Sequence, residues 1–510
     1  MPGRTVMVQG AMSSVGKSLL VAALCRIFMQ DGLRVAPFKS QNMALNSFAT
    51  RDGREVGRAQ AMQAEAAGVD VTVEMNPVLI KPEADSFAQV VVLGRPWARI
   101  KASEYMRRRG ELWGVVTGAL DALRAQYDLV VIEGAGSPAE LNLRHGELVN
   151  MAIAAYADAP VLLAGDIDRG GIFAQLLGTL MLLEDDERVR VRGLIVNKFR
   201  GDRRLFDDGV AILEQRGGVP VLGVVPFIHG LRIADEDSVA LDDRRPTTDD
   251  RRPTDARSSI DIAVIRLPHI SNFDDFDPLR AEPGVALRFV SYADELGRPD
   301  LMILPGSKTT VADLRWLRER GLADRVVELS REGVAVLGVC GGYQMLGTTI
   351  RDPLGAESDM LEIAGLGLLP VATIFAPAKQ TVRARAKIIA GAGLFANTEG
   401  REFAGYEIHM GQTELAAGAA PLAQITARGE QPAAEADGAL GVGGWVAGTY
   451  LHGLFDDDGL RHAILGNLAA HKGLDRLPPG AVFDRTLAYD RLAEAVRANI
   501  DMNLLYQLIL

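Results

Sequence analysis

Short runs of apolar residues alternate with longer amphipathic segments along almost the whole chain. Uninterrupted Val, Ile and Leu runs separated by helical segments are typical of parallel strands that helices cover on both faces. The pattern therefore predicts an α/β fold with two doubly wound, mostly parallel sheets, one in each half. The expected strands span residues 5–9, 34–37, 129–133, 160–166, 193–197 and 219–225 in the first half, and 261–267, 286–290, 301–304, 334–339 and 446–451 in the second.

One stretch between the two halves breaks this pattern. Residues 242–259 read DDRRPTTDDRRPTDARSS, which is nearly free of apolar residues and rich in charge, Pro and Thr. Such a composition cannot bury a core and indicates a linker. We therefore expect a first domain over residues 1–241 and a second over residues 260–510 that ends in C-terminal helices.

The composition is that of an ordinary globular protein, with 48% hydrophobic and 24% charged residues among 510. A net charge of −11, with only one short basic stretch at 101–109, disfavours a nucleic-acid partner. No apolar run reaches membrane-spanning length. Two cysteines cannot form a disulfide framework and favour a reducing compartment. These features predict a cytoplasmic protein with neither a nucleic-acid nor a membrane partner.

A phosphate-binding loop follows the first expected strand. Residues 6–18 read VMVQGAMSSVGKS, in which Ala11, four further residues and Gly16-Lys17-Ser18 have the Walker A spacing. The loop precedes a helix expected over 19–29, which is the context that the motif requires. Backbone N–H groups of the loop, that of Ser14 included, would cradle phosphate, while Lys17 adds a positive charge and Ser18 an oxygen for Mg²⁺. The motif predicts that ATP and Mg²⁺ bind here.

Polar side chains stand at the ends of other expected strands, where ligands of parallel sheets bind. Glu133 ends one strand and is either a Mg²⁺ ligand or a solvated charge. Asp166 and Asp168 end another and could contact a metal, a substrate or an arginine. Asn197 could bond adenine or belong to a simple turn.

Cys340 stands between a short strand and a helix in the string AVLGVCGGYQMLG at 335–347. A free cysteine is usually a small buried apolar residue. The glycines on both sides favour another interpretation, since they pack poorly in strands and suit a tight strand-to-helix turn. At a helix N-terminus, a thiolate is stabilised and backbone N–H groups can bind an oxyanion. The string therefore predicts a nucleophile.

Strings spread over nearly the whole chain resemble the cobyric acid synthase family of cobalamin biosynthesis. The first half is similar to the dethiobiotin-synthetase-like branch of P-loop proteins, and the second to class I glutamine amidotransferase domains. The strings that carry the resemblance are PFKSQNMALNSF (37–48), GRAQAMQA (57–64), MNPVLIKP (75–82), LPHISNFDDFDPL (267–279), LPGSKTT (304–310), GYEIHMG (405–411) and GTYLHGLF (448–455).

The resemblance implies a defined reaction on a corrinoid substrate. Four peripheral carboxylates of adenosylcobyrinic acid a,c-diamide become amides, each at the expense of one glutamine and one ATP. A carboxylate is a poor acyl donor and would first become an acyl phosphate, a step that needs positioning and charge neutralisation. Lys39, after the second expected strand, is either the group that holds the transferred phosphate or a surface lysine.

The resemblance also assigns roles in a glutaminase site. Cys340 would attack the glutamine amide, and His452 would be the base, with His409 as the rival candidate. The backbone N–H groups of Gly341 and of Gly306, in the turn after residues 301–304, would form the oxyanion hole.

The sequence departs from the family patterns at two places. Class I amidotransferases usually carry a Glu two positions after the catalytic His, where this chain has Leu454. The chain therefore has either a Cys–His dyad or an orienting group from elsewhere, and a dyad predicts slow glutamine hydrolysis that depends on the synthetase site. Residues 41–46 also lack the Asp expected as a Mg²⁺ ligand, so an amide oxygen or a distant residue would replace it.

Two alternatives stay open. The related cobyrinic acid a,c-diamide synthases share both domains, although they are not expected to carry the strings at 40–47 and 268–279. A ParA-like regulatory ATPase fused to an inert amidotransferase module is compatible with a P-loop that has Ala11 at the first glycine position of the motif. The polar residues of the second string, His269, Asn272, Asp274 and Asp275, could bind metal, position arginines or be structural.

Overall fold

The chain forms two compact units in a computed structural model, and neither unit is continuous in sequence. The structure describes residues 2–83, 87–144, 146–231, 233, 259–417, 419–474, 477–478 and 480–509. The first unit comprises Met1–Ala44, Glu55–Glu236 and Asp484–Leu510; the second comprises Leu45–Arg54 and Asp237–Phe483. Apart from Ser259, the linker predicted over 242–259 lies outside the described residues.

The first unit is built on the parallel sheet that the apolar runs predict. Its six strands follow the order β12-β11-β10-β1-β9-β2 and pair in parallel. Every expected strand of the first half is confirmed, with ends that differ by a few residues. The strands are β1 (Arg4–Gly10), β2 (Val35–Phe38), β9 (Leu129–Glu133), β10 (Val161–Asp166), β11 (Val191–Phe199) and β12 (Val221–Pro226).

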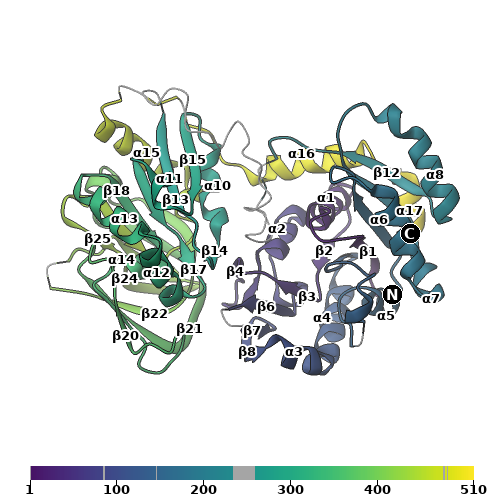
Figure 1. The fold of residues 1–510 in the computed structure, drawn as a ribbon, viewed down its shortest axis with the longest axis horizontal. Coiled ribbons are helices and arrows are strands. Elements are labelled where there is room, and N and C mark those ends of the chain that lie inside the picture. Colours follow the sequence, from purple (N-terminus) through teal and green to yellow (C-terminus); the bar gives the residue numbers. More distant parts are fainter. Residues whose placement is uncertain are drawn as a thin grey trace. The chain divides into compact units, whose positions relative to one another are not determined.

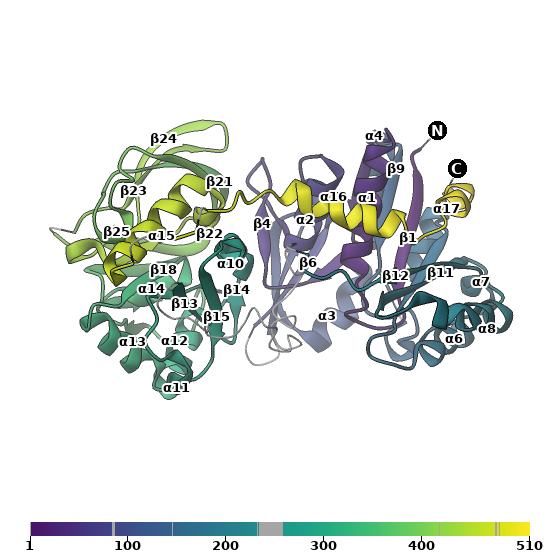
Figure 2. The ribbon, with the colours of Figure 1, turned by 90° about the horizontal axis from the view of Figure 1, so that it is seen from above.

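Helices line this sheet and complete its core. They are α1 (Lys17–Gln30), α2 (Arg58–Ala67), α4 (Trp113–Gln126), α5 (Met151–Ala157), α6 (Ile172–Leu182), α7 (Asp185–Arg188), α8 (Asp207–Gly217), α16 (Arg485–Arg497) and α17 (Met502–Ile509). In Figures 1 and 2, α16 crosses α1, with which it is in contact. Tyr489, Leu492 and Val496 of α16 belong to the same apolar core as Val6 and Leu24. The predicted second domain over 260–510 is therefore wrong for its last segment, which packs on the first unit.

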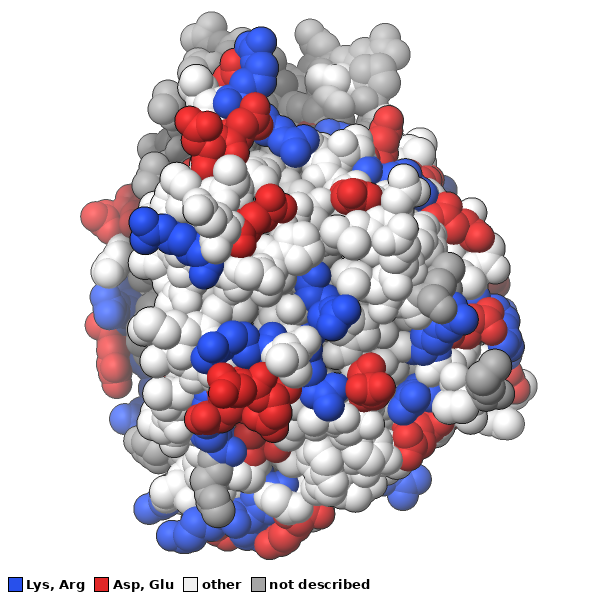
Figure 3. Space-filling view, turned by 90° about the vertical axis from the view of Figure 1, so that its right-hand side faces the viewer, with Lys and Arg blue, Asp and Glu red and all other residues white. Residues whose placement is uncertain are grey.

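A smaller four-stranded sheet extends the first unit. It has the order β3-β6-β7-β8, with β3 (Gln41–Met43), β6 (Val78–Pro82), β7 (Phe87–Val92) and β8 (Arg95–Lys101), and is followed by α3 (Ala102–Arg108). The basic stretch at 101–109 thus covers the end of β8 and a short helix. On the face drawn in Figure 3, side chains of both charges are interspersed. None of the described helices is long and apolar enough to cross a membrane.

The second unit holds another, mostly parallel sheet in the order β15-β13-β16-β18-β26-β25, in which the edge strand β25 is antiparallel to β26. Alternate residues of its strands face two cores, as a sheet covered on both sides requires. Ile262 and Ile303 pack with α10 (Asp277–Ala281) and α15 (Asp458–Lys472). Ala263 and Met302 pack on the other side, with α12 (Thr310–Glu319), α13 (Leu322–Arg331) and α14 (Gly341–Leu346). Its strands are β13 (Ile260–Ile265), β15 (Val285–Val290), β16 (Leu301–Leu304), β18 (Ala335–Val339), β25 (Ala439–Leu440) and β26 (Val446–Thr449).

A mostly antiparallel sheet in the second unit, in which only β19 pairs in parallel with β21, was not predicted. Its long hairpin pairs β21 (Val371–Ile388) with β22 (Glu402–Leu415), and β21 also pairs with β23 (Ala423–Arg428). These strands alternate buried and exposed residues, so they lack the continuous apolar runs that reveal the parallel strands. The remaining strands of this sheet are β19 (Thr349–Arg351), β20 (Glu362–Ala364) and β24 (Gln431–Asp437).

The core position of α16 leads to a stability prediction. Leu492 is 2% exposed, whereas Leu487 on the same helix is 61% exposed. We expect Leu492→Ala to lower the free energy of unfolding of the first unit by about 2–5 kcal/mol, because it leaves a cavity in that core. Leu487→Ala is the matched control and should change it by less than about 0.5 kcal/mol.

Urea unfolding followed by tryptophan fluorescence tests this prediction. In a Trp316→Phe, Trp445→Phe background, the remaining tryptophans, Trp97 and Trp113, report on the first unit alone. If both leucine variants leave that transition unchanged, α16 does not belong to the core of the first unit.

Candidate active sites

The predicted phosphate loop connects β1 to α1 in the first unit, as the Walker A motif requires. Ser14 has φ 60° and Gly16 has φ 96°, so two residues of the loop adopt the left-handed region. Lys17 begins α1, and its ammonium donates to the carbonyl oxygens of Met12 (3.3 Å) and Gly136 (3.1 Å). The lysine side chain therefore folds back over the loop, where a phosphate group would be cradled.

Glu133, at the end of β9, is the centre of the polar cluster beside this loop. Its side chain is fully buried and accepts hydrogen bonds from Ser18 Oγ (2.9 Å) and Lys39 Nζ (2.8 Å). Gln63 Nε2 donates to its second oxygen (2.5 Å) and to the Ser18 carbonyl (3.3 Å). A buried carboxylate needs such partners, because an unpaired charge is costly in a low dielectric.

This cluster fits a nucleotide with Mg²⁺. Mg²⁺ in phosphate-transfer sites takes few protein oxygens and completes its shell with water and phosphate. Ser18 Oγ and Glu133 Oε1 are hard oxygen donors within 2.9 Å of each other. Lys39, 4% exposed, and Lys17, 8% exposed, are the cations beside them. Among the described residues, no three His, Cys, Asp or Glu side chains form a metal-binding group, which leaves this sparse set as the candidate.

The other polar residues at strand ends contact the phosphate loop or residues near it, and they do not contact Glu133. Asn197 donates from Nδ2 to the Val15 carbonyl (2.7 Å), so its side chain supports the loop. Lys198 bridges the Ser14 carbonyl (2.6 Å) and Asp166 (2.8 Å). Asp168 pairs with Arg200 at 2.7 Å. Of the three partners considered for Asp168, a metal, a substrate or an arginine, the structure therefore shows an arginine.

The amides of residues 41–46 do not reach Glu133 in this arrangement. Gln41 accepts from the Tyr105 hydroxyl, and Asn42 donates to Gln60 (3.0 Å). Asn46 lies in the second unit. The amide that does contact Glu133 is Gln63, which the sequence analysis missed. Its string, GRAQAMQA, gave a signal, because two glutamines in an alanine-rich helix that faces a core require polar partners.

In the second unit, Cys340 occupies a strained turn between β18 and α14. Its φ of 52° and ψ of −110° are rare for a residue with a side chain. The turn is possible because the neighbouring glycines leave space: a Cβ on Gly342 would lie 1.9 Å from the Leu304 carbonyl oxygen. The Cys340 backbone N–H donates to Thr449 at the end of β26 (2.8 Å). This is the geometry of a nucleophile elbow.

His452 follows β26 and is close enough to Cys340 for the two side chains to interact electrostatically. On its other side, Nδ1 lies 2.6 Å from Asp275 Oδ2, and the second Asp275 oxygen accepts from the Gly453 N–H (3.1 Å). Of the two alternatives left by Leu454, the structure therefore supports an orienting group from elsewhere. The alternative of a Cys–His dyad without a carboxylate partner is therefore wrong. The reason to expect slow glutamine hydrolysis no longer holds.

Asp275 also sets the charge of His452. Burial by itself would lower the pKa of the imidazole, but the charge of Asp275 and its hydrogen bond, with Cys340 adding to them, raise the pKa to about 10. His452 is 1% exposed and Asp275 is 6% exposed, so solvent screens this pair little. At neutral pH the arrangement favours an imidazolium held between a carboxylate and a sulfur atom.

The rival base, His409, has other partners. Its ring stacks on Tyr450 with centroids 3.9 Å apart, and its nitrogens contact the Gly411 carbonyl (2.8 Å) and Glu407 (3.4 Å). Cys340 Sγ instead donates to the carbonyl of Ile408, one residue earlier (3.4 Å). The structure thus pairs the nucleophile with His452 and places His409 in a neighbouring cluster.

The two predicted oxyanion-hole positions come together beside the elbow. Gly306 lies on β17 (Gly306–Ser307), which pairs with β14 (Ile270–Ser271). A Cβ on Gly341 would lie 2.9 Å from the Ser307 backbone nitrogen, and one on Gly306 would lie 3.2 Å from His452 Cε1. Asp313 secures this strand, since it accepts from Ser307 Oγ (2.6 Å) and contacts His269 Nδ1 (2.8 Å).

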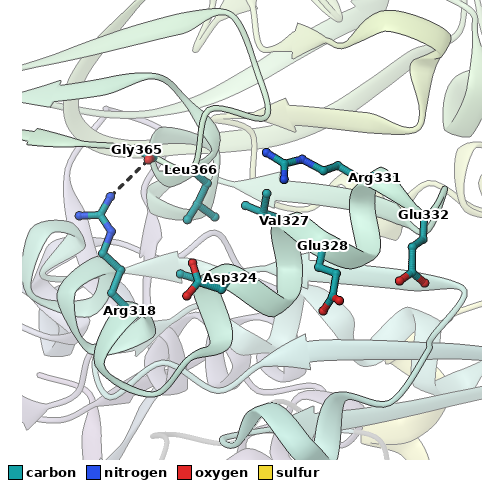
Figure 4. A pocket seen from close by; sticks show the side chains of 9 residues that line it. Arg318, Asp324, Val327, Glu328, Arg331, Glu332, Gly365 and Leu366 are labelled. Carbon is teal, nitrogen blue, oxygen red and sulfur yellow. Dashed lines mark hydrogen bonds between the residues drawn. The ribbon is translucent and has the colours of Figure 1, made fainter.

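A pocket elsewhere in the second unit has no link to these residues. It measures about 560 Å³ and is lined mainly by α12 and α13 with charged side chains of both signs (Figure 4). Arg318 at its edge donates to the Gly365 carbonyl (3.3 Å). None of the predicted site residues lines it.

Comparison with known proteins finds a matching family for each of two large parts of the chain. A family model of the CobQ/CobB/MinD/ParA nucleotide binding domain matches residues 6–239, and one of the CobB/CobQ-like glutamine amidotransferase domain matches residues 261–460. The cobyric acid synthase of Sorangium cellulosum is 54% identical over 100% of this chain and 99% of its own length. Those of Dehalococcoides mccartyi and Desulforamulus reducens are each 51% identical over 99% of this chain and 98% of their own.

The Asp275–His452 contact predicts a specific titration. Asp275→Asn removes the charge but keeps the shape, so the lowering effect of burial is opposed by less and the His452 pKa should fall well below about 10. Below its pKa the imidazole is charged, so the variant loses the imidazolium at a lower pH than the wild type. NMR titration of ¹³C-histidine-labelled protein measures this, with the His452 signal identified from its loss in His452→Gln.

Asp274→Asn is the matched control for this titration. It removes a neighbouring buried charge but keeps the Asp275 bond, so the His452 pKa should remain well above its ordinary value. An unchanged His452 titration in Asp275→Asn would contradict the proposed cause of the shift.

Proposed function

The chain belongs to the cobyric acid synthase family, glutamine-dependent amido-ligases of cobalamin biosynthesis, and on that premise we propose how its two sites divide the reaction. Cys340, His452 and Asp275 release ammonia from glutamine. The P-loop site uses ATP to activate the carboxylates of adenosylcobyrinic acid a,c-diamide, which the ammonia then converts to the amides of adenosylcobyric acid. The observation that supports this most is the buried Asp275–His452–Cys340 arrangement at a strained elbow.

The glutaminase half-reaction follows from the charges at this site. The Cys340 thiolate attacks the side-chain amide carbon of glutamine, and the developing oxyanion is stabilised by the N–H groups of Gly341 and Gly306. The C–N bond breaks as His452 gives its proton to the leaving nitrogen, which departs as ammonia. A γ-glutamyl thioester remains on Cys340.

Hydrolysis of the thioester returns the site to its starting state. His452, now neutral, takes a proton from water, and the hydroxide attacks the thioester carbon. The C–S bond breaks, glutamate leaves, and the thiolate and imidazolium are restored. Asp275 stabilises the imidazolium whenever His452 is protonated and keeps the ring in one orientation throughout, as in other triads.

The synthetase half-reaction requires positive charge more than covalent chemistry. Lys17 and Lys39 would hold the phosphates and neutralise charge as the γ-phosphoryl group moves to the substrate carboxylate. Mg²⁺, when bound by Ser18 and Glu133, would screen the phosphate oxygens. Lys39 is the better placed to accompany the transferred group, because it lies at a strand end beside Glu133. The loop backbone and Asn197 would position the rest of the nucleotide.

The alternatives differ in what they require of the amidotransferase unit. An inert module would have no need for a buried nucleophile, base and carboxylate that lie next to one another, so the ParA-like alternative has little support. The a,c-diamide synthase alternative uses the same chemistry on other carboxylates. Identification of the amidated positions by mass spectrometry and NMR of the corrinoid product separates the two.

Loss of the nucleophile should separate the two half-reactions. We expect Cys340→Ala to lower glutamine-dependent amidation by about 1000-fold or more while ammonia-dependent amidation stays within about 2-fold of wild type. Cys25→Ala is the matched control, because this second cysteine lies in the apolar core of the first unit and is not part of the glutaminase site. Retention of glutamine-dependent activity in Cys340→Ala would show the amidotransferase assignment to be wrong.

Loss of a phosphate-binding charge should stop both routes. We expect Lys39→Met to lower amidation by about 100-fold or more with either glutamine or ammonia, because carboxylate activation precedes both. Lys101→Met, an exposed lysine of the same unit, is the control. Transfer of ¹⁸O from the carboxylate to the released phosphate checks for the acyl phosphate, and its absence in the wild type would overturn this part of the proposal.

A further inference from the structure

A segment from the first half of the sequence forms part of the second unit. Residues 45–54, which we call the strap, join the second unit, whereas the residues on either side belong to the first. The strap includes β4 (Ser47–Ala49), and its Phe48 packs against Tyr406 with ring centroids 4.9 Å apart. Arg383 holds it from the other side by donating to the Ala49 carbonyl (3.1 Å).

Two asparagines bind each other where the strap begins. The Asn272 N–H donates to Asn46 Oδ1 (2.7 Å), and the Ser47 N–H donates to Asn272 Oδ1 (2.9 Å). Asn46 is fully buried and Asn272 is 3% exposed. Asn46 Nδ2 has no hydrogen-bond partner among the described residues. Burying an unpaired amide NH₂ group destabilises the fold, so stability is a poor reason for an asparagine at this position.

Asn272 lies in a turn that connects to two parts of the proposed glutaminase site. It has φ 53° and ψ 42°, a left-handed turn that a bond to its N–H helps to hold. The residue before it, Ser271, pairs with Gly306 of the predicted oxyanion hole. The Asn272 carbonyl accepts a hydrogen bond from the N–H of Asp275 (3.1 Å). One turn therefore sets the positions of both Gly306 and Asp275.

A second path leads from Asn272 to His452. Asn272 Nδ2 donates to the Tyr406 hydroxyl (3.2 Å), and the Tyr406 ring stacks on the His452 ring with centroids 5.1 Å apart and planes at 16°. The backbones of Tyr406 and His452 also exchange hydrogen bonds of 3.2 and 2.9 Å. The imidazole is thus fixed at its nitrogen by Asp275 and on its face by Tyr406, and Asn272 touches both supports.

We propose that Asn46 is a positioning residue of the glutaminase: by holding the turn at Asn272 it keeps Asp275 and Tyr406 against His452, so that a segment of the P-loop half of the chain completes the amidotransferase site. The inference rests on the proposed function, since it concerns how the base for glutamine hydrolysis is oriented. The strap is continuous with residues 39–44, which include Lys39. The segment that carries a proposed phosphate-binding lysine therefore also carries the residue that supports the base.

Kinetics of the full-length chain test this proposal. We expect Asn46→Ala to lower kcat for glutamine hydrolysis by about 10-fold or more, with KM for glutamine within about 3-fold, because misorientation of the base affects the chemical step more than binding. Ammonia-dependent amidation should stay within about 2-fold, since it does not use His452. Arg51→Ala, on the same strap, breaks an exposed ion pair with Glu430 and should change neither rate.

Two further readouts distinguish positioning from general damage. The alkaline limb of the pH profile of glutamine hydrolysis should move to lower pH in Asn46→Ala, as it should in Asp275→Asn, because the imidazolium loses its carboxylate support. The double variant Asn46→Ala, Asp275→Asn should be slowed by clearly less than the product of the two single losses, since Asn46 acts in part through Asp275.

Several results would overturn the proposal. They are an unchanged kcat in Asn46→Ala, an equal loss of ammonia-dependent amidation, or additive losses in the double variant. If the wild type hydrolysed no glutamine and Cys340→Ala changed nothing, the proposed function itself would fail, and the positioning role with it. If only Asn46→Ala were silent while Cys340→Ala removed glutamine-dependent activity, the proposed function would stand and the positioning role would not.

Discussion

The buried contact between Asp275 and His452 is the constraint around which the second unit is arranged. A carboxylate and an imidazole 2.6 Å apart, both almost excluded from solvent, are stable only if the remaining polar atoms of each have partners. The chain meets this requirement with the Gly453 N–H on one side and the Cys340 side chain on the other. The elements that carry these three residues, η7 (Phe273–Phe276), the end of β26 and the elbow before α14, are therefore held in one relative position.

The first unit uses the same principle with another carboxylate. Glu133 is fully buried, and a lysine, a serine and a glutamine from three different elements converge on it. Loss of any one partner would leave part of a buried charge unpaired, which is far more costly than loss of an exposed ion pair. In both units, then, a single buried carboxylate orders the functional side chains before any substrate binds, and preorganisation of this kind is what phosphoryl and acyl transfer require.

The division of the chain into units differs from the division of the sequence. The strap leaves the first unit at residue 45 to join the second, and α16 and α17 follow the second unit in sequence yet pack in the core of the first. Two segments thus cross between the units in opposite directions. A division into consecutive domains separated by a polar linker identifies the stretch at 242–259, but it cannot detect such exchanges. Apolar periodicity shows that one face of a helix is buried, but it does not show which unit buries that face.

The sequence by itself indicated the two mostly parallel sheets, the phosphate loop and the candidate nucleophile, whereas the candidate base was assigned by the resemblance to a family. Each of the first three depends on contacts that are local along the chain: a run of branched apolar residues, a glycine-rich turn, or a nucleophile flanked by glycines at the end of a strand. Only the tertiary structure decided that Asp275 orients His452, that Gln63 contacts Glu133 and that Asn46 belongs to the amidotransferase unit. These pairings join residues far apart in sequence, and their polar side chains suit several roles equally well until the fold shows which partner each one meets.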